Sequence, residues 1–191
     1  MNELWLILFA VVLLFDWFRE QQYIFIYYTI WTFTLETIFF ALLVAKKESY
    51  ASKLFPFLFA PSIVVCVGFW VLIAPISIST PHFSNIVLTV VTHGLNMIAM
   101  ILQPYKIYTK DIWKPILYTS VYNIFLAVYV GAGGRSISGK LPYWYAQYDK
   151  PVGWVFAGLS ICAVSAVHAL ISTRLISTRL TATKKIEPFV V

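Results

Sequence analysis

The sequence predicts an all-α fold, a polytopic transmembrane helix bundle with six spans. Of the 191 residues, 60% are hydrophobic and only 12% are charged. A typical soluble domain has about 25% charged residues, so this chain lacks the charge to cover a water-facing surface. Its apolar residues gather in six runs that approach or reach the length of about 20 residues needed to cross a bilayer. We therefore expect residues 1–191 to form a single integral-membrane domain.

The first apolar run, residues 4–18, has the length of a signal-peptide core. It is preceded by Glu3 instead of Lys or Arg, and no small-residue cleavage pattern follows it. We therefore expect a retained span. If this run does not cross, five spans remain.

The later runs are each bounded by charged or turn-forming residues. The second run stops at Lys46 and Lys47, the fourth leads into a short basic connection, and the fifth opens into the glycine-rich residues 131–134. A basic tail follows the sixth. These predicted spans are residues 23–45, 54–76, 86–104, 116–131 and 153–173.

The distribution of Lys and Arg orients the six spans. The side that holds both termini and the connections 46–53 and 105–115 carries 10 of these residues, and the other side carries 4. Because basic residues are enriched on the cytoplasmic side, both termini are predicted to be cytoplasmic or topologically equivalent. The endoplasmic reticulum, the plasma membrane and the mitochondrial inner membrane all remain open as locations.

The net charge of +6 is spread in short groups between apolar runs, so we expect no nucleic-acid partner. The expected partners are membrane lipids and other membrane subunits. Cys66 and Cys162 fall inside apolar runs, where thiols behave as small hydrophobic groups. No spacing typical of a metal site is present, and we predict neither a metal nor a cofactor.

Polar residues inside the apolar runs recur at three- and four-residue spacing, which places them on single helix faces. A rise of about 1.5 Å per residue puts Thr29 and His93 at a common depth of about 9–10 Å. The same arithmetic pairs Glu36 with His168 at about 20–22 Å. The polar sets are Thr29, Thr32 and Glu36; Thr89, His93 and Asn96; Thr119 and Asn123; and Ser165 and His168.

These residues support both functional and architectural interpretations. A hydroxyl beside a histidine is the minimum for nucleophilic catalysis, but Thr and His in membrane helices also serve as plain hydrogen-bonding groups. An ionised Glu36 in hydrocarbon costs at least about 2.5–3.5 kcal/mol, which makes it a functional candidate. Protonated and bonded to His168 or Asn123, it would be architectural. A conducting path through Glu36, His93 and His168 is a further hypothesis.

The connection 134–152 contains the aromatic segment 141–145 (LPYWY). Aromatic rings with polar tips favour the headgroup layer of a membrane. This connection therefore predicts either an interfacial anchor or a lid over a lipid site.

Three segments resemble the androgen-induced-protein family of multispanning membrane proteins. Residues 28–31 (YTIW) with 36–40 (ETIFF) are similar to its threonine-bearing helix, residues 92–96 (THGLN) to its histidine helix, and residues 141–145 to its aromatic-proline loop. The resemblance covers about two-thirds of the chain. It implies a lipid hydrolase that cleaves fatty acid esters of hydroxy fatty acids, with Thr29 at the nucleophile position.

The chain departs from this family at one position. The hydrolases carry a His-Gly-x-His pattern whose second His is catalytic, and that position is Asn96 here. An amide cannot act as a general base. His93 matches the first His, and the Rolling stone membrane proteins resemble this chain in having a His followed by Asn. We therefore expect a structural, lipid-binding or accessory component without turnover, with an intramembrane lipid-ester hydrolase using Thr29 and His93 as the alternative.

Overall fold

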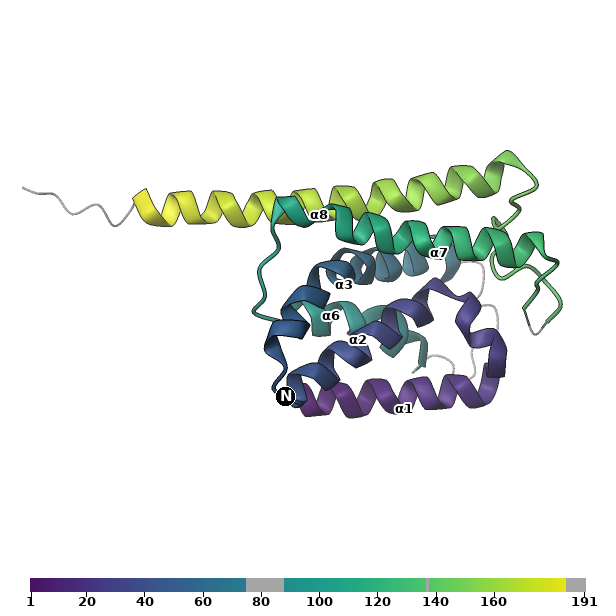
Figure 1. The fold of residues 1–191 in the computed structure, drawn as a ribbon, viewed down its shortest axis with the longest axis horizontal. Coiled ribbons are helices and arrows are strands. Elements are labelled where there is room, and N and C mark those ends of the chain that lie inside the picture. The colour runs from purple at the N-terminus through teal and green to yellow at the C-terminus, as the bar shows by residue number, and fades with distance from the viewer. Residues whose placement is uncertain (75–87, 137, 185–191) are drawn as a thin grey trace, which may run out of the picture.

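Helices form all regular structure in the described part of the chain, residues 1–74, 88–136 and 138–184 of a computed structural model (Figure 1). The all-helical fold class is confirmed. The elements are α1 (Asn2–Glu20), the 3-10 helix η1 (Gln21–Ile26), α2 (Tyr28–Val44), α3 (Glu48–Gly68) with its π-helical continuation η2 (Phe69–Ile73), the π-helix η3 (Val91–Leu95), α6 (Asn96–Ile101), the 3-10 helix η4 (Thr109–Asp111), α7 (Trp113–Gly131) and α8 (Pro151–Lys184).

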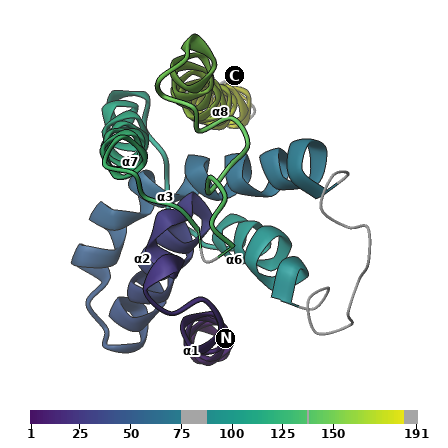
Figure 2. The ribbon, with the colours of Figure 1, turned by 90° about the vertical axis from the view of Figure 1, so that its right-hand side faces the viewer.

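The helices are arranged with α1 on one side of the molecule and α7 and α8 together on the opposite side (Figure 2). Between them lie α2, α3 and α6. The packing follows this order, because α1 contacts α2, α2 contacts α3, and α3 contacts α6, α7 and α8. The middle helices are thereby positioned to build a site that the outer helices enclose.

Successive long helices run in alternating directions (Figure 1). The amino terminus, the turn after α2 and the connection before α7 lie at one end of the bundle. Helix α8 projects beyond that same end, and the connection from α7 to α8 lies at the other.

Within the described residues, two helices are long and apolar enough to cross a membrane, Glu48–Leu72 and Pro151–Thr173. The predicted spans at 54–76 and 153–173 overlap them, and Pro75 and Ile76 lie outside the described residues. The predicted span 23–45 is shorter as an α-helix than expected, because Gln21–Ile26 is a 3-10 helix and Tyr27 is extended before α2 begins. In the predicted span 86–104, the described residues form the apolar helix Leu88–Ile101 and then leave the helix.

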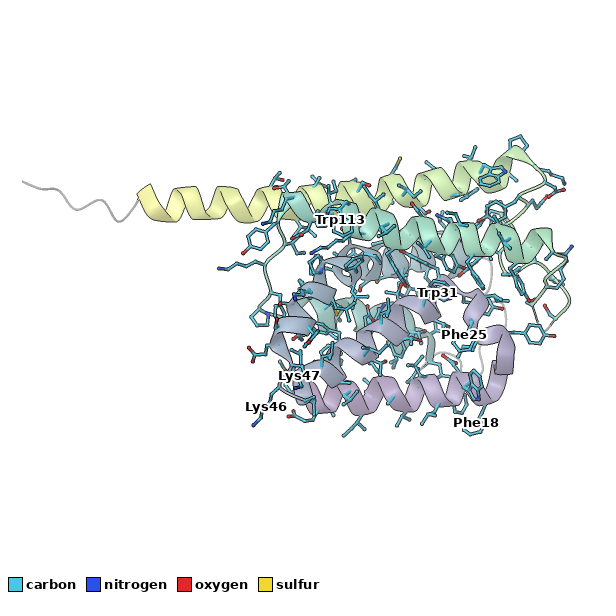
Figure 3. All side chains as sticks on the ribbon, in the orientation of Figure 1. Phe18, Phe25, Trp31, Lys46, Lys47 and Trp113 are labelled. Atoms are coloured by element: carbon cyan, nitrogen blue, oxygen red, sulfur yellow. The ribbon has the colours of Figure 1, made fainter. Side chains whose placement is uncertain are left out.

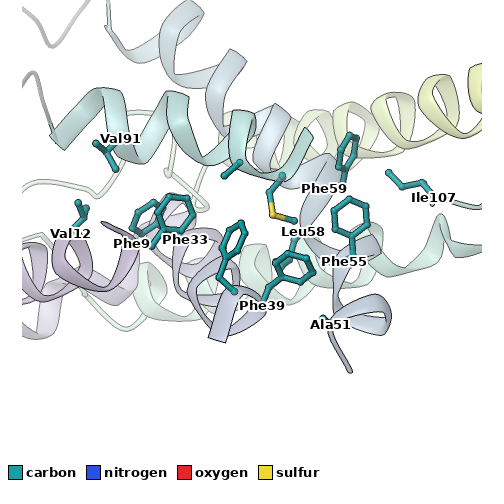
Figure 4. Close-up of a cluster of buried hydrophobic side chains, with 13 residues drawn as sticks. Phe9, Val12, Phe33, Phe39, Ala51, Phe55, Leu58, Phe59, Val91 and Ile107 are labelled. Atoms are coloured by element: carbon teal, nitrogen blue, oxygen red, sulfur yellow. The ribbon is translucent and has the colours of Figure 1, made fainter. Parts of the chain in front are cut away.

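The core is a cluster of aromatic and aliphatic side chains contributed mainly by α1, α2 and α3 (Figure 4). Phe9 and Phe33 are fully buried with ring centroids 4.4 Å apart. The ring centroids of Phe39 on α2 and Phe55 on α3 are 5.8 Å apart. Close packing of many such contacts supplies collectively large dispersion energy, which holds α1 and α3 on either side of α2.

The outward faces of the outer helices are apolar along their length. On α7 the exposed side chains include Leu117, Val121, Ile124 and Val128, which recur at helical spacing. Comparable exposed apolar residues line the outside of α1 and α8. The charged side chains gather instead near the helix ends, as with Lys46 and Lys47 in Figure 3.

Candidate functional site

Thr29 and His93 form a hydrogen bond, with 3.2 Å between Thr29 Oγ1 and His93 Nε2. Thr29 is the second residue of α2, and His93 is the central residue of the π-helix Val91–Leu95. The common depth inferred from the sequence made a contact between these two side chains possible, and the structure brings them together. A hydroxyl and an imidazole nitrogen at this separation have the geometry that a nucleophile and its general base require.

The ring of His93 is held on several sides. Its Nδ1 lies 2.8 Å from Thr92 Oγ1 and 3.3 Å from the carbonyl oxygen of Thr89. The ring stacks on Phe69 with centroids 3.7 Å apart, and the indole of Trp70 donates to the His93 carbonyl over 3.1 Å. These contacts bring η2 and η3 together, and π-helical turns are frequent at functional sites.

The start of α2 places Thr29 at a helix amino terminus. Tyr27 is extended at the N-cap position, where its side chain makes no capping hydrogen bond, and the N–H of Tyr28 donates to Tyr143 Oη over 3.0 Å. Within the described ranges no hydrogen bond is found for the N–H of Thr29. Since helix amino termini favour negative charge, this N–H can stabilise an oxyanion that forms on a carbonyl oxygen beside the Thr29 hydroxyl.

Trp31 and Phe25, labelled in Figure 3, hold the segment that leads into α2. The Trp31 indole donates to the Phe25 carbonyl oxygen over 2.6 Å. This bond ties η1 to the first turn of α2, so the Thr29 backbone has a defined position.

Thr29 lines a cavity of about 480 Å³. This volume is within the usual range for small-molecule sites, about 300–1,000 Å³. One wall is apolar and comes from α3 and η2, and the others come from α7, α8 and the connection between them. His93 is not part of the lining and contacts it through Thr29 and Phe69. The lining includes Thr29, Ile63, Val67, Phe69, Thr119, Asn123, Leu126, Phe156, Ser160 and Val167.

Three tyrosines of the α7–α8 connection cover the cavity. Tyr143 stacks on Tyr145 at 5.0 Å, and Tyr145 stacks on Phe156 of α8 at 4.6 Å. Tyr148 is the third. Burial raises the pKa of Tyr143 to about 12, so this tyrosine carries a neutral hydroxyl at physiological pH. We name Tyr143, Tyr145 and Tyr148 the tyrosine roof.

Two of the predicted polar residues lie near the cavity without contacting His93. Thr32 donates to the Tyr28 carbonyl over 3.1 Å and lies 3.2 Å from Tyr118 Oη. Asn123 is in the lining and donates to Ser160 Oγ over 3.0 Å, which joins α7 to α8. Both side chains thus connect helices.

Glu36 and Asn96 lie deeper, in a second polar cluster that includes Ser62 of α3. All three side chains are fully buried, and the Ser62 hydroxyl is hydrogen-bonded to Glu36 Oε1. The Asn96 amide approaches the Glu36 carboxyl, but Glu36 Oε2 and both polar atoms of Asn96 have no partner within hydrogen-bonding geometry in the described structure. We call Glu36, Ser62 and Asn96 the deep cluster.

The predicted pair of Glu36 and His168 is wrong. His168 Nε2 instead lies 2.9 Å from the carbonyl oxygen of Tyr108. The reason is packing, since α8 contacts α3, α7 and η4, and α3 supplies the partner of Glu36. Equal depth therefore did not produce contact.

Sequence reasoning missed Ser62, Phe69 and Trp70. Ser62 could have been singled out as a hydroxyl inside an apolar helix. Phe69 and Trp70 carry no such signal, because aromatic residues in an apolar run are indistinguishable from lipid-facing ones. Their role depends on the packing of α3 against η3.

No group of three or more His, Cys, Asp or Glu side chains in the described part of the chain could hold a metal ion. The candidate site combines the Thr29 hydroxyl, the His93 imidazole and a mostly apolar cavity with a polar cover. Comparisons of the chain with protein-family models, with curated proteins and with solved structures found no match.

Proposed function

We propose that this chain is an intramembrane lipid-ester hydrolase that uses Thr29 as the nucleophile and His93 as the general base. The observation that carries this proposal is the hydrogen bond of 3.2 Å between Thr29 Oγ1 and His93 Nε2, formed by a residue in the wall of an apolar cavity. The resemblance to the androgen-induced-protein family supports the same chemistry. His93 takes the role that Asn96 cannot perform, because an amide is not a general base and Asn96 is buried in the deep cluster.

In the proposed reaction, the Thr29 hydroxyl attacks the carbonyl carbon of an ester whose acyl chain occupies the cavity. Its proton passes to His93 Nε2, and the oxyanion forms beside the Thr29 N–H. His93 then protonates the departing alkoxide, which leaves an acyl-threonine and a free alcohol. A water molecule deprotonated by His93 attacks this ester, and the fatty acid and the Thr29 hydroxyl are released.

The proposed setting is a bilayer crossed six times with both termini in the cytoplasm. Helices α1, α2 and α7 contain 19, 17 and 19 residues, which is within the range of about 17–25 residues for a span. The exposed apolar rows on α1, α7 and α8 suit contact with lipid tails. Reporters fused to the two termini should locate both on the cytoplasmic side, and opposite locations would exclude six spans.

The hydrolase proposal is tested by labelling with an acyl-ester activity probe in detergent or nanodiscs. The probe should label Thr29 in the wild-type protein and should fail to label Thr29→Ala. Thr37→Ala is the matched control, because Thr37 also lies on α2 but bonds to the Phe33 carbonyl outside the cavity lining. Labelling that persists in Thr29→Ala would sink the proposal.

A second candidate is a lipid-binding or accessory component without turnover, and Asn96 favours it because the related hydrolases have their catalytic His at that position. This candidate predicts that a photoreactive fatty acid crosslinks to the cavity wall while the ester probe leaves Thr29 unlabelled. Crosslinking accompanied by Thr29 labelling would instead favour the hydrolase.

A further inference from the structure

Thr92 is in direct contact with the catalytic pair although it does not line the cavity. Its hydroxyl lies 2.8 Å from His93 Nδ1, and its side chain is buried with 5% exposure. We infer that Thr92 is a positioning residue that keeps the His93 proton on Nδ1 and thereby leaves Nε2 free to accept the proton of Thr29. The inference about reaction rate rests on the proposed function, whereas the inference about the proton does not.

The location of the proton follows from counting hydrogens. Thr92 has one hydroxyl hydrogen, which it donates to the carbonyl oxygen of Leu88 over 2.9 Å. Toward His93 its oxygen can therefore only accept. The second group at Nδ1, the Thr89 carbonyl at 3.3 Å, is also an acceptor. With two acceptors at Nδ1, a neutral imidazole carries its hydrogen there.

The other ring nitrogen then has the opposite role. A neutral imidazole has one donor and one acceptor nitrogen, so Nε2 presents its lone pair. Thr29 Oγ1, 3.2 Å away, donates its hydrogen to that lone pair. This is the arrangement that general-base activation of a hydroxyl requires, because the base must be unprotonated on the side of the nucleophile.

The surrounding contacts prevent the ring from turning over. Stacking on Phe69 fixes the plane of the His93 ring, and the Trp70 indole holds the His93 backbone carbonyl. A half-turn about the Cβ–Cγ bond would put Cδ2 and Cε1 where Nδ1 and Nε2 lie, and it would require the ring to leave this stack. The hydrogen bond at Thr92 therefore selects the tautomer in a ring whose orientation is already set.

Replacing Thr92 by Val keeps the volume but removes the nearer acceptor, so only the Thr89 carbonyl remains at Nδ1. The Nδ1–H tautomer should then lose population to the Nε2–H tautomer, which cannot accept a proton from Thr29. We expect Thr92→Val to lower the rate of Thr29 acylation about tenfold, the effect of losing one buried hydrogen bond. Thr92→Ser retains the oxygen and should keep the wild-type rate.

The tautomer can be measured directly by nitrogen-15 NMR of histidine-labelled protein in micelles. The chain has three histidines, His82, His93 and His168, and the His93→Asn variant identifies the His93 signals. Wild type and Thr92→Ser should show a protonated Nδ1 and a bare Nε2, and Thr92→Val should show a larger Nε2–H fraction. A monodisperse size-exclusion profile shows that each variant is folded.

The outcomes separate the two proposals. A wild-type His93 that carries its proton on Nε2, or an unchanged tautomer in folded Thr92→Val, overturns the role of Thr92. The predicted tautomers together with no labelling of Thr29 support the role of Thr92 and overturn the hydrolase. The predicted tautomers together with a slower acylation in Thr92→Val alone support both.

Discussion

The Thr29–His93 site and the deep cluster arise from the same two helical stretches but have different surroundings. Both use α2 and the Val91–Ile101 segment, and both contain polar residues that a purely apolar helix lacks. Around Thr29 and His93, donors match acceptors and one residue lines a cavity. In the deep cluster, Glu36, Ser62 and Asn96 are fully buried and polar atoms are left over. The comparison teaches that a polar residue in an apolar helix marks a buried polar cluster, whereas access to a cavity is what distinguishes Thr29 as the candidate for reaction.

The largest expected effect is a loss of turnover on substitution of His93, which substitution of Glu36 should not cause. His93→Ala should lower the turnover of an ester that carries one acyl chain by about 10²–10⁴-fold, because a positioned general base contributes that much. Glu36→Gln should leave turnover per folded molecule unchanged, since Glu36 is outside the cavity lining. The measurement is steady-state hydrolysis by purified variants. Equal losses in the two variants would mean that the deep cluster takes part in the chemistry.

The next effect concerns stability in the deep cluster. Ser62→Ala removes the hydroxyl bonded to Glu36 and leaves a buried carboxyl with one contact fewer, which should lower the free energy of unfolding by about 1–3 kcal/mol. Ser52→Ala is the matched control on α3, because the exposed Ser52 hydroxyl bonds only to the Ser49 carbonyl. Denaturant titration in micelles measures both. Similar losses in the two variants would show that the bond to Glu36 contributes nothing measurable.

The smallest expected effect tests whether the tyrosine roof takes part in lipid binding. A Cβ at Gly153 would lie 2.7 Å from the carbonyl oxygen of Gln147, so Gly153→Ala should displace the connection that carries the roof. We expect a cost of about 1 kcal/mol in stability, near the lower end for overpacking, together with a raised KM. At Gly158, also on α8, a Cβ would meet nothing within 4 Å, and Gly158→Ala should behave as wild type. A KM that rises equally in both variants contradicts a role for the roof in lipid binding.

Much of the candidate site could be predicted from residue spacing. Thr29 and His93 share a depth because their helical stretches run in the same direction and start from the same end of the bundle. Depth alone was insufficient for Glu36, because two residues at one level meet only if their helices are neighbours. Ser62 became the partner of Glu36 because α2 packs on α3.

The cavity could not be predicted in the same way. It is the space left where α3, α7 and α8 meet beneath the tyrosine roof, and its walls are apolar residues like those that face outward elsewhere. Their inward or outward orientation depends on how far each helix is rotated about its axis. Spacing reports which residues share a face, and packing sets where that face points.

The sequence by itself determined that the chain is helical, that its helices are apolar, and which few polar residues share each helix face. These properties are local, since they depend on composition and on the 3.6-residue period of the α-helix. Only the tertiary structure decided that His93 faces Thr29 and that Asn96 is enclosed with Glu36. Those contacts join residues distant along the chain, and the relative rotation and spacing of whole helices set them.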